Sequence, residues 1–209
     1  TLFRSRIEDI HVKNTGRLKE LLIPGKKCWL ELSQNPNRKT RYDLISIEHG
    51  GRIINLDSQV TNKLIAKAFL ENGIEDWENP DLVKGEVKVA NSRLDFMVKK
   101  DKKTLFLEVK GVNLVLDDGL AAFPDAVTSR GSRHLRDLLE LKNKGNEAMV
   151  LFLIQREDAK FFRPHYEMDP VFSRTFYDVL SQGVQARAYR SRVKKDSIEL
   201  GDRLEIIGV

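Results

Sequence analysis

The feature that most constrains the fold is an almost unbroken apolar run at residues 149–155, Met-Val-Leu-Phe-Leu-Ile followed by Gln155. Such a run leaves no polar face for solvent. A strand of this kind is covered on both faces, as in a sheet with helices packed on each side. Hydrophobic residues make up 41% of the 209 residues, which is enough for a sizeable core and argues against disorder. The chain is therefore expected to build a helix-flanked sheet around this segment.

The elements around this run predict an α/β (α+β) domain over residues 59–209. Apolar spacing, N-caps and glycine stops mark the helices, and short β-rich runs mark the strands. Helices are expected at residues 61–72, 129–144 and 170–182. Strands are expected at residues 82–89, 93–98, 104–110, 149–155 and 184–189, the last of them an inner strand. This order is typical of a mixed sheet flanked by helices.

Residues 1–58 show a different pattern, rich in strand and turn signals. Strands are expected at residues 28–32, 42–47 and 52–56, separated by an Asn-Pro-Asn-Arg turn and by Gly50-Gly51. This pattern predicts a small antiparallel, barrel-like module in front of the larger domain.

The bulk composition limits the class of protein. The 36 Lys and Arg residues outnumber the 31 Asp and Glu residues, which mildly favours a polyanionic partner. Cys28 is the one cysteine; we interpret it as a half-buried strand residue, and it excludes an intrachain disulfide. We find no signal peptide and no bilayer-spanning run, so we expect a soluble, cytoplasmic protein with no membrane partner. The oligomeric state stays open, a homo-oligomer included.

Two charged residues in an apolar strand carry the chemistry. In Thr-Leu-Phe-Leu-Glu-Val-Lys, residues 104–110, Glu108 and Lys110 share one face because alternate strand residues point the same way. A buried acid and lysine need compensation. A bound cation and a mutual ion pair are the two alternatives.

Asp95 adds a second carboxylate. A hairpin between its strand and that of Glu108 brings the two acids opposite each other, with Lys110 beside them. Two carboxylates can hold Mg²⁺ and leave positions for water and a phosphate oxygen. A neighbouring lysine can orient or deprotonate that water. This constellation suits phosphodiester hydrolysis.

At these residues the chain resembles the PD-(D/E)xK nuclease superfamily, whose signature is Asp…Glu-x-Lys. Longer stretches resemble the sugar fermentation stimulation protein A (SfsA) family. They are residues 12–17 (Val-Lys-Asn-Thr-Gly-Arg), 35–39 (Asn-Pro-Asn-Arg-Lys), 91–95 (Asn-Ser-Arg-Leu-Asp), 108–112 (Glu-Val-Lys-Gly-Val) and 123–131, with His134, 152–155 and 188–189.

The resemblance implies a DNA-binding protein with an N-terminal OB-like barrel and a PD-(D/E)xK nuclease-like domain. It implies catalytic roles for Asp95, Glu108 and Lys110, with Asp95 and Glu108 as ligands of Mg²⁺ or Mn²⁺. The alternative is a non-catalytic, largely sequence-nonspecific DNA-binding regulator of sugar (maltose) metabolism genes. Family members normally carry an aromatic, arginine-rich strand before the Asn-Thr-Gly-Arg motif, which residues 1–10 match poorly. Either the barrel is incomplete or some residues of this region are absent and the numbering closes the gap.

The expected DNA contacts lie mostly in loops. Basic loops and stacking aromatics are typical of nucleic-acid-binding OB surfaces, whereas an ordinary solvated surface is the alternative. Trp29 and Tyr42 could stack bases, but core packing is the expectation for Trp29. The charged run at residues 190–195 is expected to be a solvated surface. The loop before residue 129 leads into a helix N-terminus, where phosphate can bind; Thr128 could instead be only a cap and His134 only a structural hydrogen-bonding group. The expected contacts are Asn14, Arg17, Asn35, Arg38, Lys39, Arg93, Arg130 and His134.

Overall fold

The apolar run forms β9 (Glu147–Ile154) in the middle of an eight-stranded sheet. The computed structural model describes residues 8–14, 16–89 and 92–209. Within them the sheet has the order β5-β6-β7-β9-β11-β12-β10-β8. Its other strands are β5 (Leu82–Val89), β6 (Ser92–Lys100), β7 (Lys103–Val112), β8 (Leu120–Phe123), β10 (Phe161–Pro164), β11 (Gln185–Val193) and β12 (Ile198–Ile206).

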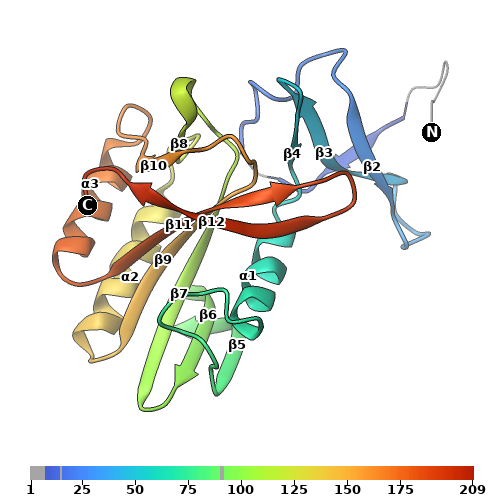
Figure 1. The fold of residues 1–209 in the computed structure, drawn as a ribbon. Helices are drawn as coiled ribbons and strands as arrows, with labels where there is room; N and C mark the ends of the chain where they lie inside the picture. The colour runs from blue at the N-terminus through green and yellow to red at the C-terminus, as the bar shows by residue number, and fades with distance from the viewer. Residues whose placement is uncertain (1–7, 15, 90–91) are drawn as a thin grey trace.

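Helices cover both faces of this sheet, as Figure 1 shows. One face carries α1 (Val60–Leu70), and the other carries α2 (Ser129–Asn143) and α3 (Pro170–Ser181). A short 3₁₀ turn, η1 (Asp117–Gly119), precedes β8. Neighbouring strands run parallel in β7–β9–β11 and antiparallel in β5–β6–β7 and β11–β12, so the sheet is mixed. No helix in the described residues is long and apolar enough to cross a membrane.

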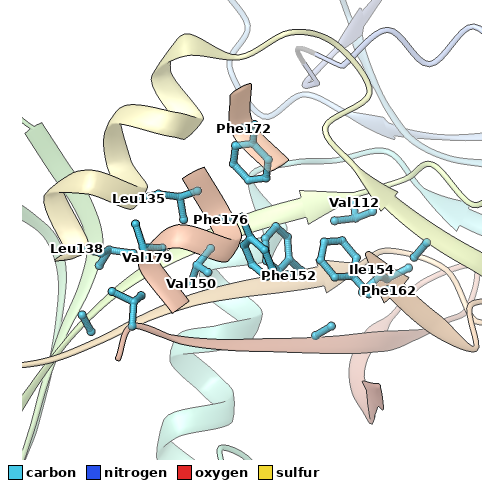
Figure 2. Packing of buried hydrophobic residues seen from close by; sticks show 14 of the residues in the cluster. Val112, Leu135, Leu138, Val150, Phe152, Ile154, Phe162, Phe172, Phe176 and Val179 are labelled. Atoms are coloured by element: carbon cyan, nitrogen blue, oxygen red, sulfur yellow. The ribbon is translucent and has the colours of Figure 1, made fainter. Parts of the chain in front are cut away.

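The side chains of β9 alternate between two buried clusters. Val150 and Phe152 pack toward α2 and α3, whereas Leu151 and Leu153 pack toward α1. Figure 2 shows Phe152 surrounded by aromatic rings, with the Phe162 ring stacked at a centroid distance of 4.1 Å. The prediction of a strand covered on both faces is confirmed, and this core fixes the strands that carry the charged residues.

The N-terminal sheet has its own core. It contains β1 (Ile10–Val12), β2 (Cys28–Leu32), β3 (Tyr42–His49) and β4 (Arg52–Asn55). β3 pairs with the other three strands. Its buried cluster comprises Leu18, Leu21, Leu44, Ile47, Ile54 and Leu56. Residues 1–7, on which part of the expected incomplete barrel depends, lie outside the described residues, as do Thr15 and Asn91 of the quoted motifs.

The strand count in the larger sheet corrects the prediction. β8, β10 and β12 were not expected, so the strand that we expected to be last is followed by another one. The charged run after residue 189 was expected to be a solvated surface, but β11 continues to Val193, and Ser191 within it is buried. Pairing with β12 shifts register between Tyr189 and Ser191. A Cβ at Gly201 would lie 2.7 Å from the Arg190 carbonyl oxygen, so this close approach requires glycine.

Two residues of β2 are also more exposed than expected. Cys28 is exposed rather than half-buried. Trp29, for which core packing was expected, is absent from the buried clusters and lies half-exposed, with the Lys27 ammonium 5.3 Å from its ring centroid. This side of the N-terminal sheet therefore presents an aromatic ring to a groove rather than to a core.

Candidate active site

The candidate site is centred on a buried carboxylate, that of Glu108 on β7. Only 4% of Glu108 is exposed. Its Oε1 atom lies 2.5 Å from Lys110 Nζ and 2.5 Å from His134 Nδ1. Its Oε2 atom is also buried but has no hydrogen-bond partner. Because an unpartnered buried oxygen is costly, this carboxylate is balanced on one side and unsatisfied on the other.

Asp95 reaches the same place from β6. The β6–β7 hairpin is regular from Lys100–Lys103 to Phe96–Leu107, and the paired residues end one position before Asp95. The Asp95 carboxylate accepts a hydrogen bond from the Val109 backbone N–H at 2.7 Å, and another from Asn62 Nδ2 at 2.7 Å. The expected hairpin is confirmed. Asn62, on α1, was not foreseen, because nothing in its local pattern distinguishes it from other polar helix residues.

The two acids differ in their electrostatic environments. Burial and the negative charge of Glu108 raise the pKa of Asp95, against the hydrogen bonds from Val109 and Asn62. Burial also acts to raise the pKa of Glu108, but the hydrogen bond from His134 and the charge of Lys110 outweigh it and lower that pKa. Glu108 is therefore the more acidic of the two, and its negative charge disfavours ionisation of Asp95.

The start of α2 holds His134 in place. Thr128 is the N-cap and accepts a hydrogen bond from the Gly131 N–H at 3.0 Å. Arg130 lies one turn before His134 in α2, and its Nε atom is 3.4 Å from His134 Nε2. If Arg130 donates to Nε2, the Nδ1–H group of His134 points at Glu108. The capping reading of Thr128 thus holds, and His134 is a buried hydrogen-bonding group, 2% exposed.

A cleft of about 360 Å³ opens beside these residues, between the two sheets. Lys110 lines it, whereas Asp95 and Glu108 are not among its lining residues. Gln155 is fully buried at its edge; Nε2 donates to the Asp57 carbonyl at 3.1 Å, and Oε1 has no partner. A Cβ on Gly111 would lie 2.8 Å from that Oε1 atom, so glycine lets the amide approach β7. The cleft also includes Asn14, Gly16, Thr128 and Arg130.

The remaining predicted DNA contacts are dispersed, and several are engaged within the protein. Asn14 donates to the Leu56 carbonyl at 2.9 Å and to Asn113 Oδ1 at 3.2 Å. The Arg17 N–H donates to Asp125 at 2.8 Å. None of Arg17, Asn35, Arg38, Lys39 and Arg93 lines the cleft.

Two of these residues pair with acids outside the cleft. Arg38 forms a bidentate pair with Asp43, at 2.7 and 3.0 Å. The exposed Arg93 pairs with Glu86 at 3.1 Å. Asn35 and Lys39 are exposed on the loop between β2 and β3. The structure thus gathers Asp95, Glu108, Lys110, Arg130 and His134, with Asn14 at the same cleft, and leaves the other predicted contacts apart.

In the described part of the chain, no three His, Cys, Asp or Glu side chains form a metal-binding cluster. Any cation here would rely on the Asp95–Glu108 pair together with waters or backbone oxygens. Mg²⁺ is commonly held by one or two carboxylates in this way.

Comparison with known proteins identifies relatives over nearly the full chain. The model described as "SfsA N-terminal OB domain" matches residues 2–56, and "Sugar fermentation stimulation protein RE domain" matches residues 59–197. A sugar fermentation stimulation protein homolog of Clostridium tetani is 44% identical over 199 residues, 95% of this chain and 86% of that protein. A homolog from Thermoanaerobacter sp. (strain X514) is 40% identical over 198 residues, with the same coverage of both chains.

A solved structure agrees with these matches. The structure of Pyrococcus furiosus SfsA in complex with Ca²⁺ superposes with a TM-score of 0.89 at 30% sequence identity. The match covers 97% of this chain and 87% of that chain. The expected fold class, an N-terminal OB domain followed by a mixed sheet with helices, is therefore confirmed.

Proposed function

Because the chain belongs to the sugar fermentation stimulation protein (SfsA) family, we propose that it binds DNA and hydrolyses phosphodiester bonds with a divalent cation. In this proposal the eight-stranded sheet is a PD-(D/E)xK nuclease-like core, and the two domains divide between residues 58 and 59. Asp95, Glu108 and Lys110 are the catalytic residues. Asp95 and Glu108 hold Mg²⁺ or Mn²⁺.

The observation that carries the proposal is the unsatisfied oxygen of Glu108. Its Oε2 atom is buried without a partner, next to a second carboxylate whose pKa it helps to raise. A hard cation between the two acids satisfies that oxygen and removes their repulsion. Carboxylate oxygens are the ligands that Mg²⁺, Mn²⁺ and Ca²⁺ prefer, so the residues present fit such an ion.

A relative supports this reading. The P. furiosus SfsA structure was determined in complex with Ca²⁺. Ca²⁺ and Mg²⁺ both take oxygen ligands but differ in size and in preferred geometry. Carried over to this chain, that complex supports a divalent cation site, with Mg²⁺ or Mn²⁺ as the ion that sustains the reaction.

When bound, the cation would stabilise charge on the phosphoryl group and lower the pKa of a water molecule. The protein supplies the positioning. Lys110 reaches the cleft from β7 and can donate to a phosphate oxygen or orient the attacking water. His134 fixes Glu108, and Asn62 fixes Asp95. The exposed guanidinium of Arg130 offers a two-pronged contact to phosphate at the same cleft.

A specific observation favours the rival function, a non-catalytic DNA-binding regulator of sugar (maltose) metabolism genes. Lys110 and His134 both contact Glu108 Oε1, so the charge on Glu108 is partly balanced inside the protein without a cation. Net charge does not separate the two functions, because +5 suits any DNA-binding protein. Only cleavage distinguishes them.

The test compares the wild type with Glu108→Gln and Lys110→Ala on single-stranded and duplex DNA, in Mg²⁺, in Mn²⁺ and in EDTA. Glu140→Gln, an exposed acid on α2, is the matched control. We expect metal-dependent cleavage that falls at least about 100-fold in both site variants, as when one transition-state charge stabiliser is removed. DNA binding should persist. Equal cleavage by all four proteins would indicate a contaminant and end the catalytic proposal, whereas binding without cleavage in either metal would favour the regulator.

A further inference from the structure

A second groove, of about 440 Å³, lies between the N-terminal sheet and the turn that joins β11 to β12. We call it the hairpin groove. Figure 1 shows the β11–β12 hairpin projecting past α1 toward β2–β4. The hairpin groove shares no lining residue with the cleft at Lys110. It is thus a separate feature of the surface, built from three distant parts of the chain.

Three cross-strand neighbours line the N-terminal side of this groove. Trp29 on β2 is opposite Ser46 on β3, and Ser46 is opposite Asn55 on β4. Trp29 is half-exposed, and the Ser46 hydroxyl is buried with no hydrogen-bond partner. The Asn55 amide donates to the Asp57 carbonyl at 2.9 Å. This side of the groove therefore offers an aromatic ring beside a polar group whose hydrogen bond the protein does not make.

Lysines come from the other two parts of the chain. Lys63 lies in the first turns of α1, and Lys194 and Lys195 lie in the hairpin turn. All three are exposed, and among the described residues none has an ion pair within 4.0 Å. The hairpin turn places two of these cations across the groove from the aromatic ring.

The acidic residues of the groove only partly offset these lysines. Lys13 Nζ lies 2.8 Å from Asp57, 3.5 Å from Asp43 and 3.8 Å from Glu31, so one cation is shared among three acids, of which Glu31 is exposed. The carboxylates in the lining are those of Glu31, Asp57 and Asp196, which gives four lysines against three acids. The exposed lining carries Lys63, Lys194 and Lys195 against Glu31 and Asp196, so the accessible part is basic by a small margin, to which Lys27 adds over the Trp29 ring.

We propose that the hairpin groove binds a segment of single-stranded nucleic acid, with a base against Trp29 and phosphates along Lys63, Lys194 and Lys195. The proposal rests on the proposed DNA-binding function and names its strand form and its contacts. Aromatic rings flanked by cations bind single strands without sequence preference, because every base has a face to stack. In a duplex the bases are stacked within the helix, so Trp29 would have no base to contact.

This assignment changes which part of the N-terminal sheet contacts DNA. Of the loop residues expected to bind, Arg38 is held by Asp43 and Asn35 caps its own turn. Lys194 and Lys195 belong to the charged run that we had expected to be only a solvated surface. The difference comes from β12, whose pairing with β11 turns that run into a hairpin tip.

The test measures binding of a short oligothymidylate, and of a duplex of equal length, in EDTA. Quenching of tryptophan fluorescence reports stacking on Trp29. The Trp29→Phe variant shows how much of the signal comes from the buried Trp77. The affinity variant is Lys63→Ala/Lys194→Ala/Lys195→Ala. Its matched control, Lys99→Ala/Lys102→Ala/Lys103→Ala, removes the same charge at the exposed β6–β7 turn.

We expect the single strand to quench Trp29 and the duplex to quench it much less. The groove variant should bind the single strand at least about tenfold more weakly than its control. The slope of log affinity against log salt concentration should be smaller in magnitude by about 2 in the groove variant. Each phosphate contact on a single strand contributes about 0.7 to that slope, and the variant lacks three lysines. Equal affinity of the two triple variants, equal quenching by duplex, or no binding by the wild type would each overturn the proposal.

The outcome is separable from the nuclease proposal. Lysine-dependent quenching without cleavage in any metal would leave the groove assignment standing and remove the catalytic one. Suppose instead that Glu108→Gln abolishes metal-dependent cleavage and that replacing the three lysines leaves binding unchanged. That result would keep the catalytic proposal and remove the groove assignment. Glu108→Gln itself should quench like the wild type, because Glu108 does not line the hairpin groove.

Discussion

Two buried carboxylates in this molecule have nearly equal exposure and opposite hydrogen-bonding states. Asp43, in the N-terminal sheet, is 5% exposed, and Glu108, in the eight-stranded sheet, is 4% exposed. Both oxygens of Asp43 are occupied: the Arg38 guanidinium grips them at 2.7 and 3.0 Å, and Lys13 adds a contact at 3.5 Å. Glu108 receives two donors on Oε1 and none on Oε2.

The difference separates a structural ion pair from a candidate ligand site. Buried charges are tolerated when their hydrogen-bonding capacity is filled. At Asp43 the protein fills it, and the Arg38 hydrogen bond lowers the pKa of Asp43 despite its burial. At Glu108 the protein fills half of it and sets a second acid nearby. Burial of an acid is thus a poor indicator of function by itself, and the unfilled oxygen is the informative feature.

The largest expected effect is stabilisation by a divalent cation that Glu108→Gln abolishes and Asp43→Asn does not. At a free ion concentration 100-fold above its dissociation constant, a ligand of the folded state adds about 2.7 kcal/mol. For a chain of this size that corresponds to a rise in Tm of roughly 5–10 °C. Thermal unfolding with Ca²⁺ or Mn²⁺, reversed by EDTA, measures it.

The two variants make this a matched comparison, because each replaces one buried carboxylate by its amide. An ion-induced rise of the same size in Glu108→Gln would show that the ion binds elsewhere, and the contrast between the two carboxylates would lose its meaning. Loss of the rise in Asp43→Asn would show that the N-terminal sheet contributes to the ion site.

The second effect concerns the free energy of unfolding without metal, where Asp43→Asn should be the more destabilising of the two substitutions. We expect Asp43→Asn to lower the free energy of unfolding by about 1–3 kcal/mol, because an amide offers one oxygen where the Arg38 fork needs two acceptors. Glu108→Gln in EDTA should cost less than about 1 kcal/mol, since the amide oxygen can still accept from Lys110 and His134 while the unpartnered charge disappears. Urea unfolding of both variants gives the comparison, and a larger loss in Glu108→Gln would contradict it.

The sequence predicted the parts of this comparison that depend on local pattern. The alternation of Glu108 and Lys110 in an apolar strand set them on one face, and the hairpin tip after Lys100 joins the strand of Asp95 to the strand of Glu108. The run that forms β9 required helices on both faces. In each case neighbours along the chain determine the outcome.

The missed parts depend on contacts between distant segments. The bond from His134 to Glu108 exists because α2 packs on β7, and that from Asn62 to Asp95 exists because α1 packs on the opposite face. β12 was missed because Gly201 and Asp202 interrupt its alternation, and its strand state depends on pairing with β11. The filled state of Asp43 was missed for the same reason: Arg38 was read as a DNA contact, and its partner lies on the next strand.

The smallest effect, and the sharpest test of the filled carboxylate, is the pH dependence of stability. The Arg38 hydrogen bond holds the pKa of Asp43 below its ordinary value, against the effect of burial. In the unfolded chain an aspartate titrates near its ordinary pKa of about 3.9. Above that pH both states are ionised, and the contribution of the ion pair is fully present. As pH falls, the unfolded state takes up the proton first, and the contribution is lost by the time pH passes the lowered folded pKa.

The stability gap between the wild type and Asp43→Asn should therefore be constant from about pH 7 to 5 and shrink as pH falls from about 4 toward 3. Urea midpoints of both proteins, in EDTA, measure the gap. A gap that widens on acidification would mean that Arg38 does not hold Asp43 as an anion. Asp43 would then not be the structural carboxylate in the comparison with Glu108.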